Sequence, residues 1–327
     1  MATTAKAIRF AKTGGPEVLE LQEVQVGDPG PGQIRIRHHA IGLNYLDTYQ
    51  RSGLYKLELP SGLGSEAAGV VEAVGSGVAD LRPGDRVAYG GAPLGAYSDV
   101  RLMPAERVVK LPDGIGFEQA AAMMLKGMTA EYLLRRTYQV KAGQTILVQA
   151  AAGGVGLILC QWAKALGVTV IGTAGSDEKA ALARAHGCEH TVVYTRENFT
   201  ARVREITGGK GVPVVYDSVG KDTFMGSLDC LEPFGMLVVF GASSGPVPPF
   251  DINLLQTKGS LFLTRPTLNT YNAKREALVA SANALFDVVL AGKVRIEINQ
   301  RYALKDAAQA HRDLEARKTT GSTLLIP

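Results

Sequence analysis

Residues 145–176 read TILVQAAAGGVGLILCQWAKALGVTVIGTAGS, and this stretch decides the fold. An apolar run, Thr145 to Val148, leads into a glycine-rich turn, and Val155 to Leu166 follows with helical spacing. A second apolar run, Val168 to Ile171, comes next. A strand, glycine turn, helix and strand in this order form the context of a dinucleotide-binding fingerprint. The fingerprint is degenerate here, because Ala151 occupies the first glycine position.

The turn residues suit a phosphate ligand. Gly153 lets the backbone approach a pyrophosphate, and Gly156 lets the helix pack on the strand. The start of the helix supplies amide donors and positive potential, so we expect Gly153, Gly154 and Val155 to bind the cofactor. Glycine- and alanine-rich turns also occur for packing reasons alone, and it is the flanking elements that favour a cofactor site.

The residues after the second strand favour NADPH over NADH. An NAD site normally has a carboxylate here that accepts hydrogen bonds from the ribose, and none occurs from Gly172 to Ser176. Ser176 is able to donate to a phosphate, and Lys179 adds positive charge one helical turn later. We expect Gly175 and the Tyr194 hydroxyl to lie beside the same ribose phosphate. The alternative reading makes Ser176 only a helix cap and Lys179 only a solvated lysine.

The wider pattern predicts two domains of different class. Apolar strands alternate with helices after residue 141, which is typical of a parallel sheet covered on both faces. Before residue 120, short strand-like runs between Gly, Pro and Asp turns predict a β-rich antiparallel domain. Between the two, Phe117 to Tyr138 has helical spacing interrupted by Gly127. The tail predicts a strand near Val294 to Ile298 and a helix after it.

Composition excludes several classes of protein. The 327 residues are 46% hydrophobic and 20% charged, which excludes a disordered chain. A net charge of +4 with no basic run gives no reason to expect a nucleic-acid partner. We expect no membrane segment and no signal peptide. The three cysteines are widely spaced and form no CxxC pair, so we expect no disulfide framework and a cytoplasmic location.

Several segments together resemble a known family over the whole chain. They are Gly42 to Tyr49, Arg51 to Tyr55, Gly64 to Gly69, Ala150 to Gln161 and Tyr216 to Gly220. The chain resembles the zinc-less medium-chain dehydrogenases/reductases, specifically the NADPH:quinone oxidoreductases of the bacterial quinone reductase and zeta-crystallin type. The resemblance implies an α/β protein with a GroES-like catalytic domain, residues 1–124 completed by 294–327. A Rossmann domain of doubly wound parallel sheet, residues 125–293, would bind NADPH.

The residues argue against a metal site. Zinc-dependent members of the superfamily have a ligating His where Ser65 stands and a Cys near Asn44, whereas no Cys precedes Cys160 here. His38 and His39 are neighbours on a predicted strand and point to opposite faces, so they cannot share one ion. We therefore expect no bound metal. Without a Lewis acid alcohol oxidation is disfavoured, and a quinone or another conjugated carbonyl is the expected acceptor.

The resemblance implies a set of catalytic residues in the cleft between the domains. Tyr49 would donate a hydrogen bond to the acceptor oxygen, and Asn44 would position nicotinamide or substrate. Tyr55 would lie at the pocket. For Asp47, a structural hydrogen-bonding role is favoured over a role as a catalytic acid. For either tyrosine the alternative is simple packing of a loop.

Further cofactor contacts follow from the same resemblance. Lys126 is expected near the phosphates and Thr129 near the nicotinamide amide. The other expected contacts are Ser218, Phe240, Gly241, Ser243, Leu263, Arg265 and Arg317. The resemblance also implies a homodimer that pairs the edge strands at residues 260–264.

Two other functions remain open from the sequence. One is an NADPH-dependent enone, 2-alkenal or enoyl reductase on the same scaffold, since these acceptors also present a conjugated carbonyl. The other is a non-catalytic NADPH-binding protein with a structural or RNA-associated role.

Overall fold

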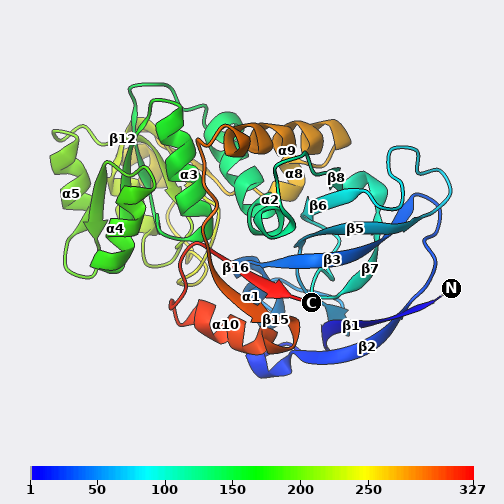
Figure 1. Cartoon of the computed structure of the whole chain (residues 1–327). Helices are drawn as coiled ribbons and strands as arrows, with labels where there is room; N and C mark the ends of the chain where they lie inside the picture. The colour runs from blue at the N-terminus through cyan, green and yellow to red at the C-terminus, as the bar shows by residue number, and fades with distance from the viewer. Residues whose placement is uncertain (1) are drawn as a thin grey trace. The chain divides into compact units, whose positions relative to one another are not determined.

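The computed structural model describes residues 2–327, which divide into two compact units (Figure 1). The first unit contains the residues up to Met128 together with Asn272–Leu290 and Ile296–Pro327. The second contains Thr129–Tyr271 and Ala291–Arg295, and the chain passes from one to the other within helix α2 (Phe117–Tyr132). In residues 2–327 no helix has both the length and the apolar character needed to cross a membrane.

The second unit is built on a six-stranded sheet whose neighbouring strands are all parallel. Its strand order is β11-β10-β9-β12-β13-β14, so the order reverses between β9 and β12. Right-handed crossovers place helices α3 and α4 on one face and α5 and α6 on the other. The predicted doubly wound parallel sheet is confirmed.

The elements of this unit follow the predicted alternation of strand and helix. The strands are β9 (Thr145–Val148), β10 (Thr169–Ala174), β11 (His190–Val193), β12 (Val212–Asp217), β13 (Leu231–Val239) and β14 (Phe262–Thr264). The helices are α3 (Gly154–Ala165), α4 (Asp177–Ala185), α5 (Phe199–Ile206), α6 (Phe224–Asp229), α7 (Asn253–Thr257) and α8 (Leu268–Tyr271), with a π-helical turn at Leu133–Thr137. Leu147, Ile171 and Val215 lie in one fully buried cluster, which explains why these strands read as continuous apolar runs.

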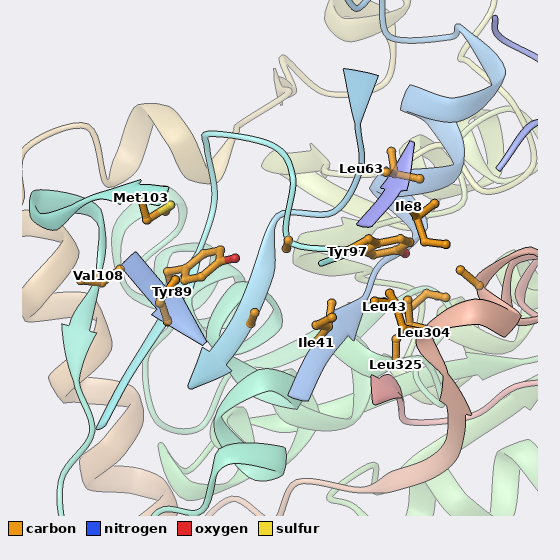
Figure 2. Close-up of a cluster of buried hydrophobic side chains, with 14 of the residues drawn as sticks. Ile8, Ile41, Leu43, Leu63, Tyr89, Tyr97, Met103, Val108, Leu304 and Leu325 are labelled. Carbon is orange, nitrogen blue, oxygen red and sulfur yellow. The ribbon is translucent and has the colours of Figure 1, made fainter. Parts of the chain in front are cut away.

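The first unit is rich in β-structure, as predicted. A seven-stranded sheet joins β15-β16-β3-β5-β6-β8, with β7 paired to β3, and a three-stranded sheet joins β2-β1-β4. The strands are β1 (Thr3–Phe10), β2 (Glu20–Val26), β3 (Gln33–Leu43), β4 (Ser61–Gly62), β5 (Glu66–Val74), β6 (Arg86–Gly90), β7 (Val100–Pro104), β8 (Val109–Lys110), β15 (Ile298–Ala303) and β16 (Ser322–Ile326). The helices are α1 (Tyr45–Ser52), α9 (Arg275–Leu290) and α10 (Ala307–Glu315), with 3-10 turns at Pro16–Val18, Ala105–Arg107 and Leu304–Asp306. Figure 2 shows the core of this unit, where Ile41, Tyr97 and Leu325 meet from distant parts of the chain.

Two local predictions were wrong. Helix α2 runs through Gly127 without interruption, because the glycine faces helix α9: a Cβ there would lie 2.4 Å from Cδ1 of Leu285. The glycine therefore permits close helix packing and does not break the helix. The strand expected at Val294 to Ile298 lies instead at Ile298–Ala303, because this later segment is the one that pairs with β16.

A buried chain of polar side chains ties helix α10 to helix α1 in the first unit. Tyr97 donates to Oδ2 of Asp47 at 2.8 Å, and Nε2 of His311 lies 3.1 Å from the same hydroxyl. Arg51 donates to Nδ1 of His311 at 3.1 Å and pairs with Glu315 at 2.6 Å. Because arginine is always a donor, Nδ1 accepts, and the hydrogen of His311 must sit on Nε2 and point at Tyr97.

Burial shifts the pKa values of two members of this hydrogen-bonded chain, Asp47 and His311. Burial raises the pKa of Asp47 to about 7, against the lowering effect of its hydrogen bonds from Asn44 and Tyr97. Burial also lowers the pKa of His311 to about 3, with the Arg51 charge acting in the same direction. Among the described residues Oδ1 of Asp47 has no hydrogen-bond partner, which adds to the cost of ionising this carboxyl.

We predict that Asp47→Asn removes a pH dependence of stability. The folded state holds the Asp47 proton more tightly than the unfolded state, so the wild type should lose stability relative to the variant as pH rises from 3.8 to about 7. Above that range the difference should stay constant. Melting temperatures of the two proteins across acid and neutral pH measure it, with Asp113→Asn at an exposed position as control. A wild-type-minus-variant difference that does not change with pH would contradict the prediction.

Candidate functional site

The glycine turn leaves the start of helix α3 open. Gly153 is the exposed N-cap of the helix, no side chain caps it, and the first turn carries no acidic residue. The turn is tight: Ala150 has a left-handed φ of 55°, and its carbonyl accepts from the Gly153 amide at 3.0 Å. A Cβ on Gly156 would lie 2.5 Å from this carbonyl, so only glycine fits there. Free amides and the helix dipole make this end a suitable site for a phosphate.

A second group gathers beyond the end of strand β10. Ser176 caps helix α4, and its hydroxyl accepts from the amide of Lys179 at 3.3 Å. The hydroxyl of Tyr194, a side chain that is 40% exposed, would lie 2.7 Å from a Cβ on Gly175. The first carboxylate after the strand, Asp177, forms an ion pair with Arg196. The structure therefore brings together the four residues expected to select a ribose phosphate.

The loops after β12, β13 and β14 also meet. The amide of Ser243 donates to the Ser218 carbonyl at 3.2 Å, and Arg265 donates to the Gly241 carbonyl at 3.3 Å. A Cβ on Gly241 would lie 2.6 Å from the Ser218 carbonyl. Phe240 directly precedes this contact and Leu263 lies in β14. These residues lie at the carboxyl ends of parallel strands, where ligands bind in open α/β sheets.

In the first unit, Asn44 is held by a buried ion pair that the sequence did not predict. Its Nδ2 donates to Oε2 of Glu66 at 2.8 Å, and Lys126 Nζ lies 2.9 Å from the same oxygen. The Leu125 amide donates to Oε1 at 2.8 Å. The feature of the sequence that could have indicated this ion pair is a single carboxylate, Glu66, directly before the small apolar residues Ala67 to Gly69.

Lys126 has a different environment from the one expected of a phosphate ligand. Its side chain is 7% exposed, and the ammonium is paired with the completely buried Glu66 carboxylate. A buried lysine in such a pair neutralises its partner, because an unpaired charge there would be strongly unfavourable. The placement favours this structural role over contact with a phosphate.

The aromatic candidates lie together on and after helix α1. The ring centroids of Tyr45 and Tyr49 are 5.4 Å apart, and those of Tyr49 and Tyr55 are also 5.4 Å apart. Tyr49 is 8% and Tyr55 38% exposed. Asp47 is completely buried and accepts a hydrogen bond from Tyr97.

Two further candidates occupy contrasting places. Thr129 is buried in helix α2 of the second unit. Arg317 is an exposed residue of the first unit that follows helix α10 with a left-handed φ of 59°.

The two adjacent histidines have different environments. His38 is buried between the Ser98 carbonyl and the Tyr89 hydroxyl, while its exposed neighbour His39 stacks on Phe117. Within residues 2–327 no three His, Cys, Asp or Glu side chains are grouped as metal ligands.

Comparison with known proteins identifies the family. Residues 30–113 match the alcohol dehydrogenase GroES-like domain, and residues 154–278 match the zinc-binding dehydrogenase domain. A quinone oxidoreductase of Pseudomonas aeruginosa is 60% identical over 99% of this chain and 100% of its own. A 2-haloacrylate reductase of a Burkholderia species is 49% identical over 97% of each chain.

A solved structure extends the likeness to three dimensions. The crystal structure of Escherichia coli quinone oxidoreductase complexed with NADPH has a TM-score of 0.97 and 51% identity, covering 98% of this chain and 100% of that one. The chain therefore belongs to the quinone oxidoreductase family of the medium-chain dehydrogenases/reductases.

Proposed function

We propose that the protein is an enzyme that reduces quinones with NADPH, without a bound metal. The observation that carries the proposal is the pairing of an open, uncapped helix start at Gly153 with a carboxylate-free strand end at Gly175 and Ser176. The first suits a pyrophosphate, and the second suits a ribose that bears an extra phosphate. The family relatives named for quinone reduction, and the relative solved with NADPH, support the same activity.

The residues of the second unit fit NADPH. Gly154 and Val155 would hold its pyrophosphate through backbone amides, and Gly153, whose own amide is bonded to the Ala150 carbonyl, would let the backbone approach it. Ser176 and Lys179 would hold the ribose phosphate, and the ion pair of Asp177 with Arg196 limits the repulsion from the nearest carboxylate. Bound NADPH supplies the reducing equivalents. The loops that carry Ser218, Phe240, Gly241, Ser243, Leu263 and Arg265, together with Thr129 and Arg317, are proposed as its further contacts.

The acceptor is proposed to lie against the tyrosines of the first unit. Tyr49 would donate a hydrogen bond to one quinone oxygen, and the ring of Tyr55 would limit access of water. Asn44 would position the nicotinamide or the substrate, since Glu66 holds its side chain at 2.8 Å and Asp47 holds its backbone amide at 2.9 Å. An acceptor that is already electrophilic requires orientation more than activation.

The oligomeric state and location complete the proposal. Strand β14 ends the six-stranded sheet, and Phe262 on it is 56% exposed, so a second copy pairing there would cover an open edge. We therefore propose a homodimer. The three cysteines are free thiols, which agrees with a reducing cytoplasm. We assign catalysis to residues 1–124 and 294–327 and cofactor binding to 125–293.

A second candidate function is supported by one relative. The 2-haloacrylate reductase shares 49% identity with the chain, so reduction of a conjugated alkene is the alternative activity. A non-catalytic NADPH-binding role has no such support.

A panel of acceptors tests the proposal. The full-length protein with NADPH should reduce 1,4-benzoquinones with a higher kcat/KM than 2-alkenals or 2-haloacrylates. Faster alkene reduction would assign it to the alternative. Tight NADPH binding with no turnover of any acceptor would favour the non-catalytic role.

We predict that Lys179→Ala weakens the binding of NADPH but not that of NADH. Loss of one charged contact to the ribose phosphate should raise the Kd for NADPH about tenfold, or about 1.4 kcal/mol. Fluorescence titration with both nucleotides measures the effect, and Lys164→Ala at the other end of helix α3 is the control. Equal losses for the two nucleotides would remove Lys179 from the specificity site.

We predict that Tyr49→Phe lowers kcat/KM for the quinone about tenfold, because one hydrogen bond to the acceptor is lost. The Kd for NADPH should not change. Tyr302→Phe removes a hydroxyl that bonds Asp313 elsewhere in the first unit and is the matched control. Unchanged quinone kinetics in the Tyr49 variant would leave this tyrosine with a packing role.

A further inference from the structure

Four buried polar side chains form a continuous chain under the glycine turn. They are Gln149, Thr173, Ser227 and Asp217, each at most 1% exposed. Thr173 donates to Oε1 of Gln149 at 2.6 Å, Nε2 of Gln149 donates to Ser227 at 3.1 Å, and Ser227 donates to Oδ2 of Asp217 at 2.8 Å. The chain crosses from β10 past β9 to β12 and α6, the region where the strand order reverses.

The carboxylate at one end dictates the direction of every bond. Asp217 accepts from the amides of Val219 and Gly220 at 2.8 and 3.0 Å, and from the hydroxyls of Thr223 and Ser227. Because Ser227 donates to it, the Ser227 oxygen is left to accept from the amide group of Gln149. That orientation turns Oε1 of Gln149 toward the hydroxyl of Thr173.

The other end of the chain reaches the turn itself. Thr173 uses its hydrogen on Gln149, so its oxygen accepts from the Ala150 amide, at 3.2 Å. Ala150 has the left-handed φ of 55°, a conformation that is unfavourable for a residue other than glycine. Its carbonyl supports Gly153 and faces Gly156. The hydrogen-bonded side chains therefore hold Ala150 in its strained conformation. The backbone of Ala150 in turn sets the position at which helix α3 begins.

One charge thus organises two loops. Through Thr173 it reaches the turn after β9, and through its own amide bonds it orders residues 218–220 after β12. Both loops follow strands that are neighbours in the sheet, and both carry expected cofactor contacts.

We propose that Thr173, Gln149, Ser227 and Asp217 are positioning residues that set the affinity for the pyrophosphate part of NADPH. Their side chains are at most 1% exposed, so they would act through the backbone of Ala150 and not by direct contact with the cofactor. The inference rests on the proposed NADPH function and adds the residues that determine how tightly one part of the molecule is held.

Binding of two ligands by the same variant tests this inference. Thr173→Val keeps the shape and removes the hydroxyl, and it should raise the Kd for NADPH about tenfold or more. The Kd for adenosine 2′-phosphate, which has the ribose phosphate but no pyrophosphate, should not change. Thr173→Ser should restore NADPH affinity. Thr207→Val, which removes a hydroxyl bonded to the Val203 carbonyl of helix α5, is the matched control.

Two further measurements separate positioning from general stability. Ser227→Ala removes the residue that lies three hydrogen bonds from Ala150 and should show the same selective loss. The Thr173→Val/Ser227→Ala double variant should show no added loss. Without any ligand, amide hydrogen exchange in residues 149–153 should be faster in both variants than in wild type.

Each outcome is decisive. Equal weakening of both ligands, or no weakening of either, would overturn the positioning role while leaving the NADPH proposal intact. A wild-type protein that binds adenosine 2′-phosphate and NADPH equally poorly would overturn the proposed function, and this inference with it. Ser227→Ala supplies the test should Thr173→Val fail to fold.

Discussion

The left-handed backbone of Ala150 is the constraint on which the candidate cofactor site depends. Where strand β9 ends, the chain must reverse into helix α3 within a few residues, and the φ of 55° at Ala150 makes this turn. Gly156 then allows the helix to lie against the Ala150 carbonyl. A larger residue at Gly156 would move the helix start and its free amides. The geometry of a few backbone atoms therefore determines where the proposed site would hold a phosphate.

In both units a buried charged side chain fixes the position of uncharged polar side chains. In the second unit the Asp217 carboxylate orients two hydroxyls and an amide. In the first, the pair of Glu66 with Lys126 fixes the amide of Asn44. A buried ion pair such as Glu66 with Lys126 contributes little net stability, because desolvation offsets much of the attraction, but it leaves one low-energy arrangement.

Prediction from the sequence was most successful where the signal was periodic or local. The alternation of strand and helix after residue 141 gave the parallel sheet, and the residues around Gly175 and Ser176 were brought together as expected. It failed at Gly127 and at Val294 to Ile298, where a distant partner decides the outcome. A glycine breaks an isolated helix, yet the same glycine is required where another helix packs closely.

The amino-acid sequence by itself determined the fold class, the glycine turn before helix α3 and the absence of a carboxylate from Gly172 to Ser176, because each of these is encoded by neighbouring residues. Only the tertiary structure decided the environment of Lys126, the burial of Asp47 beside Tyr97 and His311, and the chain from Asp217 to Ala150. The partners in these contacts are separated by tens to hundreds of residues along the chain. Burial and hydrogen bonding arise from how such segments pack, and no local pattern in the sequence records them.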